Sequence, residues 1–176
     1  MSRSLACRVT LDHPRLVIGV LELTDPVVAA KTISVQAKDL QQAQRESRRL
    51  LQEFRAKFEE PASAMLDITV HVAESARAAR RQISEAVSTI SDGVTYVGTA
   101  AGLAGLIADI GIAGVADGVT LRPAIPDSVT MLTLLAHDVV PLLERRGIRT
   151  RPDAVAQIRN LTERVRTPCS TIAIAV

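Results

Sequence analysis

Apolar residues gather in short continuous runs at several places along the chain. Runs that are rich in β-branched residues and bounded by turn-forming residues are typical of strands buried on both faces of a sheet. This pattern predicts strands over residues 15–21, 32–36, 65–72 and 118–123. Asp67 is unusual because it places a carboxylate inside the third of these predicted strands.

Between these runs the apolar residues recur at steps of three and four positions. The longest example follows Asp39, a suitable N-cap for a helix with one buried stripe and one charged face. The arginines of this helix are interpreted as part of a solvated face. The predicted buried stripe consists of Leu40, Ala43, Leu50, Leu51, Phe54 and Phe58.

Further helices are predicted from the same spacing. They cover about 75–90, the segment from the N-cap Thr99 to the stop signals Gly111 and Gly114, the segment from 126 to 147, and residues 151–166. Pro141 should kink the predicted helix over residues 126–147. Strands therefore alternate with helices, which implies parallel strands covered by helices and predicts an α/β fold class.

Composition narrows the function only a little. The chain has 176 residues, which suits one domain, and apolar residues make up 47% of it but aromatic residues only 2%. The lack of Trp argues against a stacking platform for single-stranded nucleic acid, and the interspersed charges, with a net charge of +2, form no obvious phosphate-binding face. We therefore expect no nucleic-acid partner.

The sequence shows neither a membrane-spanning segment nor a signal peptide. The longest apolar run, residues 94–108, falls short of the ~20 residues needed to cross a bilayer. The N-terminus has no apolar core of the kind found in signal peptides. We expect a cytoplasmic protein without a membrane partner.

Few residues are candidates for catalysis or for binding a metal or a nucleotide. Cys7 and Cys169 lie far apart and suit free thiols in a reducing compartment, and the three histidines, His13, His71 and His137, are each isolated from a second metal ligand. We expect no metal site. The glycines of residues 98–105 do not follow the dinucleotide-binding order and are better explained by close packing of a helix. Catalytic residues stay unassigned.

Several spaced motifs nevertheless occur in a fixed order between residues 97 and 150. They are Val97-Gly98-Thr99, Ala108-Asp109, Asp117-Gly118 with Leu121 and Pro123, Ile125-Pro126, and Val139-Val140-Pro141-Leu142-Leu143 with Arg145-Arg146-Gly147. In this order they resemble the C-terminal segment of the luciferase-like flavin-dependent monooxygenases, a family that includes nitrilotriacetate and dibenzothiophene-sulfone monooxygenases. Weaker similarity upstream extends the resemblance to residues 8–150.

The resemblance implies half of a TIM-like (β/α)8 barrel. The four predicted strands match barrel strands five to eight, and residues 151–176 form a C-terminal helix and tail. A complete barrel typically needs ~250 residues. Half a barrel leaves strand edges unpaired, so the resemblance implies a homo-oligomer or a partner chain that supplies the missing half.

The resemblance also implies a cofactor, namely FMN or another reduced flavin, or the deazaflavin F420, at the carboxyl ends of the strands. Thr24, Gln36 and Arg122 are the candidate cofactor-binding residues. Thr24 offers a hydroxyl to the flavin phosphate, although Glu22 and Asp25 bring negative charge to the same loop. Arg122 is the candidate contact for an anion or a substrate, and it equally suits a surface salt bridge.

Two functions follow from these observations. The first is an oxidoreductase subunit or fragment of the flavin-dependent monooxygenase family that acts on a small organic substrate. The alternative is a non-catalytic remnant or assembly module that has lost flavin binding. A small-ligand binder without flavin is a third, weaker option.

Overall fold

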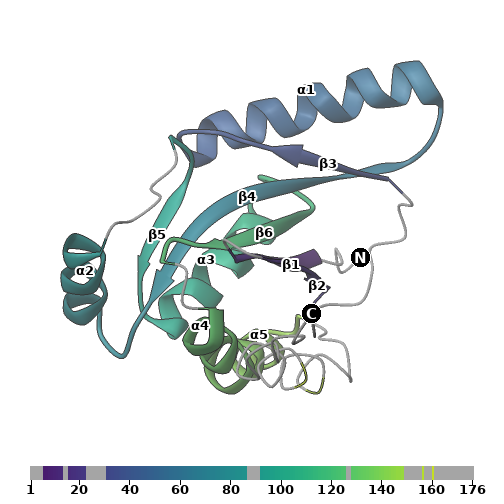
Figure 1. Cartoon of the computed structure of the whole chain (residues 1–176). Helices are drawn as coiled ribbons and strands as arrows, with labels where there is room; N and C mark the ends of the chain where they lie inside the picture. The colour runs from purple at the N-terminus through teal and green to yellow at the C-terminus, as the bar shows by residue number, and fades with distance from the viewer. Residues whose placement is uncertain are drawn as a thin grey trace, which may run out of the picture.

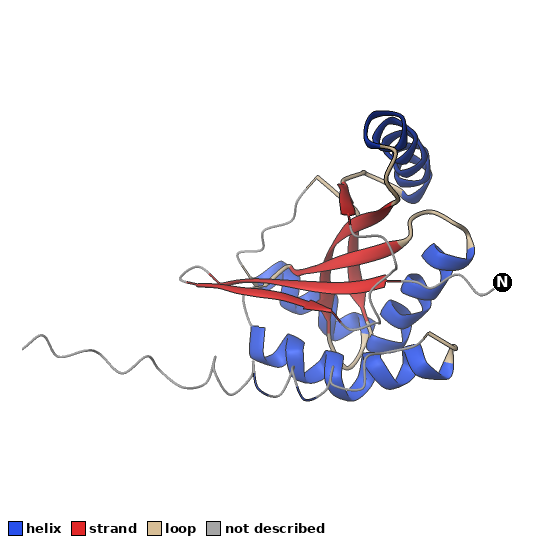
Figure 2. Cartoon of the chain, turned by 90° about the vertical axis from the view of Figure 1, so that its right-hand side faces the viewer, coloured by secondary structure: helices blue, strands red, loops and turns tan. Residues whose placement is uncertain are grey.

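The computed structural model describes residues 6–13, 16–22, 31–86, 92–125 and 128–148, together with residues 156 and 160. Within this part the chain forms one six-stranded sheet with helices on its flanks (Figure 1 and Figure 2). The strands are β1 (Ala6–His13), β2 (Leu16–Glu22), β3 (Lys31–Val35), β4 (Ala62–Val72), β5 (Thr95–Gly98) and β6 (Gly118–Pro123). The helices are α1 (Leu40–Phe58), α2 (Ala76–Glu85), α3 (Ala100–Ile112), α4 (Ser128–Leu134), the π-helical turn η1 (Leu135–Val139) and α5 (Val140–Arg145).

The strand order is β2-β1-β6-β4-β3, with β5 paired to β4. β4 is the central strand and lies parallel to β3, β5 and β6, while β6 is also parallel to β1. β3 pairs with the first half of β4 and β5 with the second half, because the eleven residues of β4 are long enough for both. The α/β fold class with parallel, helix-covered strands is therefore confirmed.

The N-terminal part of the sheet differs from the sequence-based prediction. Residues 15–21 were expected to form a parallel strand, the fifth of a barrel, but β2 is antiparallel to β1 and lies at the far edge of the sheet. The prediction was wrong because a preceding strand, β1, had not been recognised. Only two residues separate β1 from β2, which is enough for an antiparallel hairpin but far too few for a parallel crossover.

β1 lies on the side of β6 that does not pair with β4. It runs parallel to β6, with Cys7 opposite Val119 and Val9 opposite Leu121. The sheet also contains the short strand β5, which the sequence pattern did not predict.

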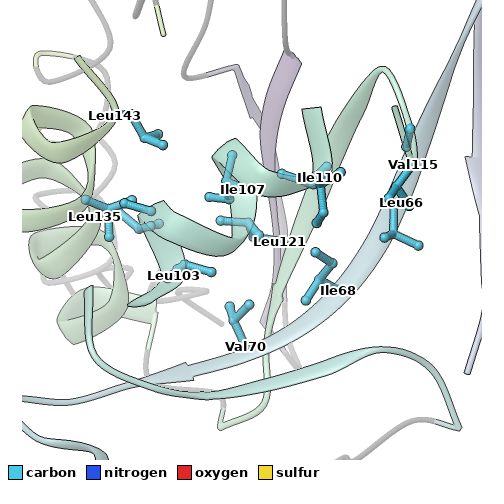
Figure 3. Close-up of a cluster of buried hydrophobic side chains, with 14 of the residues drawn as sticks. Leu66, Ile68, Val70, Leu103, Ile107, Ile110, Val115, Leu121, Leu135 and Leu143 are labelled. Carbon is cyan, nitrogen blue, oxygen red and sulfur yellow. The ribbon is translucent and has the colours of Figure 1, made fainter. Parts of the chain in front are cut away.

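The main core lies between the sheet and the helices. Alternate residues of β4 and β6 point into it, and α3 supplies the facing side chains (Figure 3). α3 also packs against η1 and α5, which explains why it is apolar on more than one side. The centre of the core consists of large, fully buried side chains: Leu66, Ile68, Leu103, Ile107, Ile110, Leu121, Leu135 and Leu143.

α1 lies alongside β3 (Figure 1) and begins as predicted. The side chain of Asp39 accepts a 2.7 Å hydrogen bond from the amide of Gln42. Ala43 is fully buried, and Leu40, Leu50 and Leu51 pack against the core, but Phe58 is 50% exposed. The predicted buried stripe is wrong at Phe58, because the helix there has run past the strands that cover its first half.

The charged face of α1 is solvated, as predicted. Arg49 is exposed and forms 2.7 Å ion pairs with Glu46 and Glu53, one turn away on either side. Hydrogen bonds from Glu46 and then Glu53 raise the pKa of Arg49 above its ordinary value. The group stays charged at any pH at which the protein is handled.

The remaining helices agree with the predicted ranges where they are described. Ser75 and Thr99 cap α2 and α3 through their hydroxyls, and Gly114 after α3 has a φ of 62°, in the left-handed region that favours glycine. The last helix contains a π-helical turn directly before Pro141. The predicted helix over 151–166 lies outside the described residues, apart from residues 156 and 160.

Candidate functional site

β4 has two chemically different faces. Its even-numbered residues from Ala64 to Val72 belong to the apolar core. Its odd-numbered residues face the other way, as the alternation of a strand requires. Polar groups dominate this second set, which consists of Ser63, Met65, Asp67, Thr69 and His71.

Two neighbouring strands extend this polar face around Asp67. Ser34 of β3 donates a 3.0 Å hydrogen bond from Oγ to Asp67 Oδ2. From the opposite side, Arg122 of β6 donates from Nη2 to the same oxygen, also over 3.0 Å. Three adjacent parallel strands thus each contribute one residue to a cluster, the Ser34–Asp67–Arg122 cluster.

The two charged members differ in exposure. The Asp67 side chain is only 10% exposed, whereas the Arg122 side chain is 44% exposed. Asp67 lies at the middle of β4, and Arg122 is the next-to-last residue of β6. The more exposed group of the pair, the Arg122 guanidinium, therefore lies towards the carboxyl end of the parallel strands.

His71 is a second polar residue at this end of β4. Its Nε2 lies 2.9 Å from Oε1 of Gln82, which belongs to α2. If the amide oxygen accepts this bond, Nε2 carries the proton. His71 thus has a hydrogen-bond partner on α2, eleven residues away in the sequence.

The structure places the three sequence-predicted site residues differently. Arg122 lies in the cluster, at the end of β6. Gln36 follows β3 directly and is exposed, two residues after Ser34. Thr24 lies outside the described residues. Asp67 and Ser34 were missed as site residues, although the presence of a carboxylate in an apolar strand was a signal for the first.

Asp117 lies directly before β6 and is bonded to the start of β4. Asp117 Oδ2 accepts a 3.0 Å hydrogen bond from the amide of Ala64, and its own amide donates to the Ala64 carbonyl over 2.9 Å. These bonds join the start of β6 to the start of β4, at the end of the sheet opposite Arg122.

The glycine-rich stretch at the start of α3 also has a structural explanation. The hydroxyl of Tyr96 donates to the carbonyl of Thr99 over 2.9 Å and accepts from its amide over 3.1 Å. A Cβ on Gly98 would lie 2.5 Å from this hydroxyl, and a Cβ on Gly102 would collide with it as well. The glycines make room for an aromatic side chain, in line with the close packing predicted for them.

Among the described residues, no group of three or more His, Cys, Asp or Glu side chains is arranged to hold a metal ion. In the same part of the chain, no helix is both long enough and apolar enough to cross a membrane.

Comparison with solved structures agrees with this description of the fold. EDTA monooxygenase (EmoA) from Chelativorans sp. BNC1 superposes with a TM-score of 0.57 at 12% identity, over 76% of this chain and 44% of that protein. DmoA from Hyphomicrobium sulfonivorans gives a TM-score of 0.56 at 13% identity, over 82% and 49% of the two chains. For the long-chain alkane monooxygenase LadA the values are 0.55 and 15%, over 74% and 41%.

These neighbours are luciferase-like flavin-dependent monooxygenases with TIM-barrel folds. The chain spans less than half the length of each of them. At these identities the likeness shows a shared fold. No protein-family profile matches the sequence, and no curated protein matches it.

Proposed function

We propose that the chain is an oxidoreductase module of the luciferase-like flavin-dependent monooxygenase class. The observation that carries this proposal is the Ser34–Asp67–Arg122 cluster, which places a partly exposed cation at the carboxyl end of parallel strands. Barrel enzymes of this architecture build their active sites at that end. The three structural neighbours support the same class.

Arg122 is the residue proposed to contact the cofactor or an anionic part of the substrate. Its exposed guanidinium fits a phosphate, because an arginine donates paired, charge-assisted hydrogen bonds to phosphate oxygens. Gln36 and Thr24 are proposed as further contacts, from the segments that follow β3 and β2. Bound flavin would supply the oxygen chemistry, and the protein would orient a small organic substrate beside it.

Comparing FMN with riboflavin tests this proposal, since the two differ only in the phosphate. The wild-type chain should quench the fluorescence of FMN in a saturable titration. Arg122→Ala should lower the affinity for FMN at least about tenfold, as expected for the loss of hydrogen bonds to a charged group. Riboflavin binding should change little. Arg49→Ala is the matched control, because Arg49 is an exposed cation already paired on α1.

The outcome that overturns the proposal is a folded wild-type chain that binds neither FMN, in its oxidised or reduced form, nor F420. Equal losses of FMN and riboflavin in Arg122→Ala would refute the phosphate contact alone. Binding of F420 without FMN would keep the oxidoreductase class and change the cofactor.

A second candidate is a non-catalytic remnant of the same fold that has lost flavin binding. The observation that favours it is β1, which already occupies the side of β6 where a completing half-barrel would add its first strand. A partner chain would therefore have to pair elsewhere or displace the β1–β2 hairpin. Light scattering and an FMN titration of the purified chain separate the two candidates: a folded monomer without flavin affinity supports the remnant, and saturable flavin binding refutes it.

A further inference from the structure

We infer that Asp67 is a positioning residue that both orients Arg122 and limits its attraction for anions. This inference deepens the proposed function, because it concerns the same guanidinium and assigns its ligand to the class of phosphate-like anions. It rests on the geometry of the Ser34–Asp67–Arg122 cluster. No sequence motif carries it.

The orienting role follows from how the carboxylate is held. Asp67 Oδ2 receives one hydrogen bond from β3 and one from β6, each of 3.0 Å. Its side chain is nearly buried and belongs to the central strand, so its position is fixed by the sheet. Arg122, by contrast, has a long side chain with considerable rotamer entropy. A fixed acceptor at one amino group reduces the orientations in which the exposed part of the guanidinium meets a ligand.

The limiting role follows from charge. Asp67 and Arg122 have opposite charges in direct contact, so an anion that approaches the guanidinium also approaches the carboxylate. At a separation of about 6 Å and an effective dielectric constant of about 40–80, one repelling charge weakens binding about three- to tenfold. The wild-type chain should therefore bind phosphate weakly, and the Asp67 charge should contribute to this weakness.

Two uncharged variants separate these roles. Asp67→Asn removes the charge but keeps an oxygen that accepts from both Ser34 and Arg122. Asp67→Ala removes the charge and the acceptor together. Because both variants lose the same charge, any difference in their affinity for an anion reports the orientation of Arg122. Ser34→Ala is a third variant, which keeps the Asp67 charge but removes the hydrogen bond that fixes it from β3.

The experiment is a titration of each full-length variant with inorganic phosphate, followed by NMR shifts of arginine side chains at low salt. Circular dichroism first establishes that each variant is folded at the working temperature. We expect Asp67→Asn to bind phosphate about three- to tenfold more tightly than wild type, and Asp67→Ala to bind about tenfold more weakly than Asp67→Asn. Ser34→Ala should lower the affinity for phosphate about threefold relative to wild type. Arg122→Ala should abolish the saturable NMR shift on titration with phosphate.

A merely structural role for Asp67 predicts a different result. In that case both Asp67 variants lower the free energy of unfolding, and the folded proteins share one phosphate affinity. Equal affinities of the two variants, or a folded wild-type chain without saturable phosphate binding, would overturn the inference. Phosphate binding with the expected order but without FMN binding would leave the inference standing and refute the proposed function.

Discussion

Asp117 and Ala64 are joined by two hydrogen bonds at the point where β6 begins beside β4. The carboxylate of Asp117 accepts from the buried Ala64 amide at 3.0 Å, and the Asp117 amide donates to the Ala64 carbonyl at 2.9 Å. β4 and β6 are neighbours in the centre of the sheet, and Asp67 and Arg122 lie farther along the same pair. The register that brings those two residues together is therefore secured at the opposite end of the strands.

Replacing Asp117 should destabilise the protein without a direct effect on the cluster. Asp117→Ala leaves the buried Ala64 amide without its charged acceptor, which should cost about 2 kcal/mol in the free energy of unfolding. Asp117→Asn keeps an acceptor and should cost about half as much. Urea denaturation measures both changes. A loss below the error of the method in Asp117→Ala would show that the bond does not secure the strand.

Two glycines of α3 should respond to alanine with opposite signs. Gly102→Ala places a Cβ against the Tyr96 hydroxyl, so we expect a loss of about 1–3 kcal/mol in unfolding free energy. Gly105 has its nearest neighbour, an Arg146 guanidinium nitrogen, at 3.6 Å, which is an ordinary contact. Gly105→Ala should therefore gain about 0.5–1 kcal/mol from helix propensity.

The cause of the Gly102 loss can be checked with a second change. Tyr96→Phe removes the hydroxyl that the new Cβ would meet. In a double-mutant cycle, Gly102→Ala should cost less in the Tyr96→Phe background than in wild type. Strictly additive losses would contradict a collision with the hydroxyl.

The sequence predicted those parts of the fold whose signals lie within a few neighbouring residues. Asp39 and Thr99 have the side chain that an N-cap needs, and both cap the helices predicted from them. The parallel strands β4 and β6 were also found, because each contains apolar and β-branched residues within a short segment of the sequence. The same signal identified residues 15–21 as a strand but gave no information on its direction.

The direction of β2 is set by its partner strand β1, which has only a weak hydrophobic signal in the sequence. β1 contains Arg8 and Asp12, so it does not stand out as an apolar run. The Asp67 cluster was missed for a related reason. Its three members come from strands that are 33 and 55 residues apart in sequence, and only the register of the sheet brings them together. A single odd residue, Asp67, was the part of this arrangement visible in the sequence.

Ser47 offers a test of packing in α1. It is only 3% exposed, and within the described part of the chain its hydroxyl has no hydrogen-bond partner. Ser47→Ala removes a buried polar group and increases helix propensity, so it should raise the free energy of unfolding by about 1 kcal/mol. Urea denaturation measures the gain. A loss of stability would show that the hydroxyl is satisfied after all, for example by ordered water.

Pro141 provides the last prediction, because it was expected to kink a helix that instead contains a π-helical turn. The turn covers Leu135–Val139, and the amide of Val140 bonds to the carbonyl of Leu135, five residues earlier. A proline inside a regular α-helix lacks an amide and clashes with the carbonyl four residues before it, at a cost of about 3 kcal/mol. A wider turn directly before Pro141 moves that carbonyl away and relieves much of this cost.

Pro141→Ala should consequently stabilise the protein only modestly. A new amide at position 141 can bond within the helix, but the unfolded chain also gains conformational freedom, which offsets about 0.4–1 kcal/mol. We expect a net gain of about 1 kcal/mol in unfolding free energy, measured by urea denaturation. A net loss would mean that the π-helical turn already accommodates the proline fully, and that Pro141 stabilises the fold by restricting the unfolded chain.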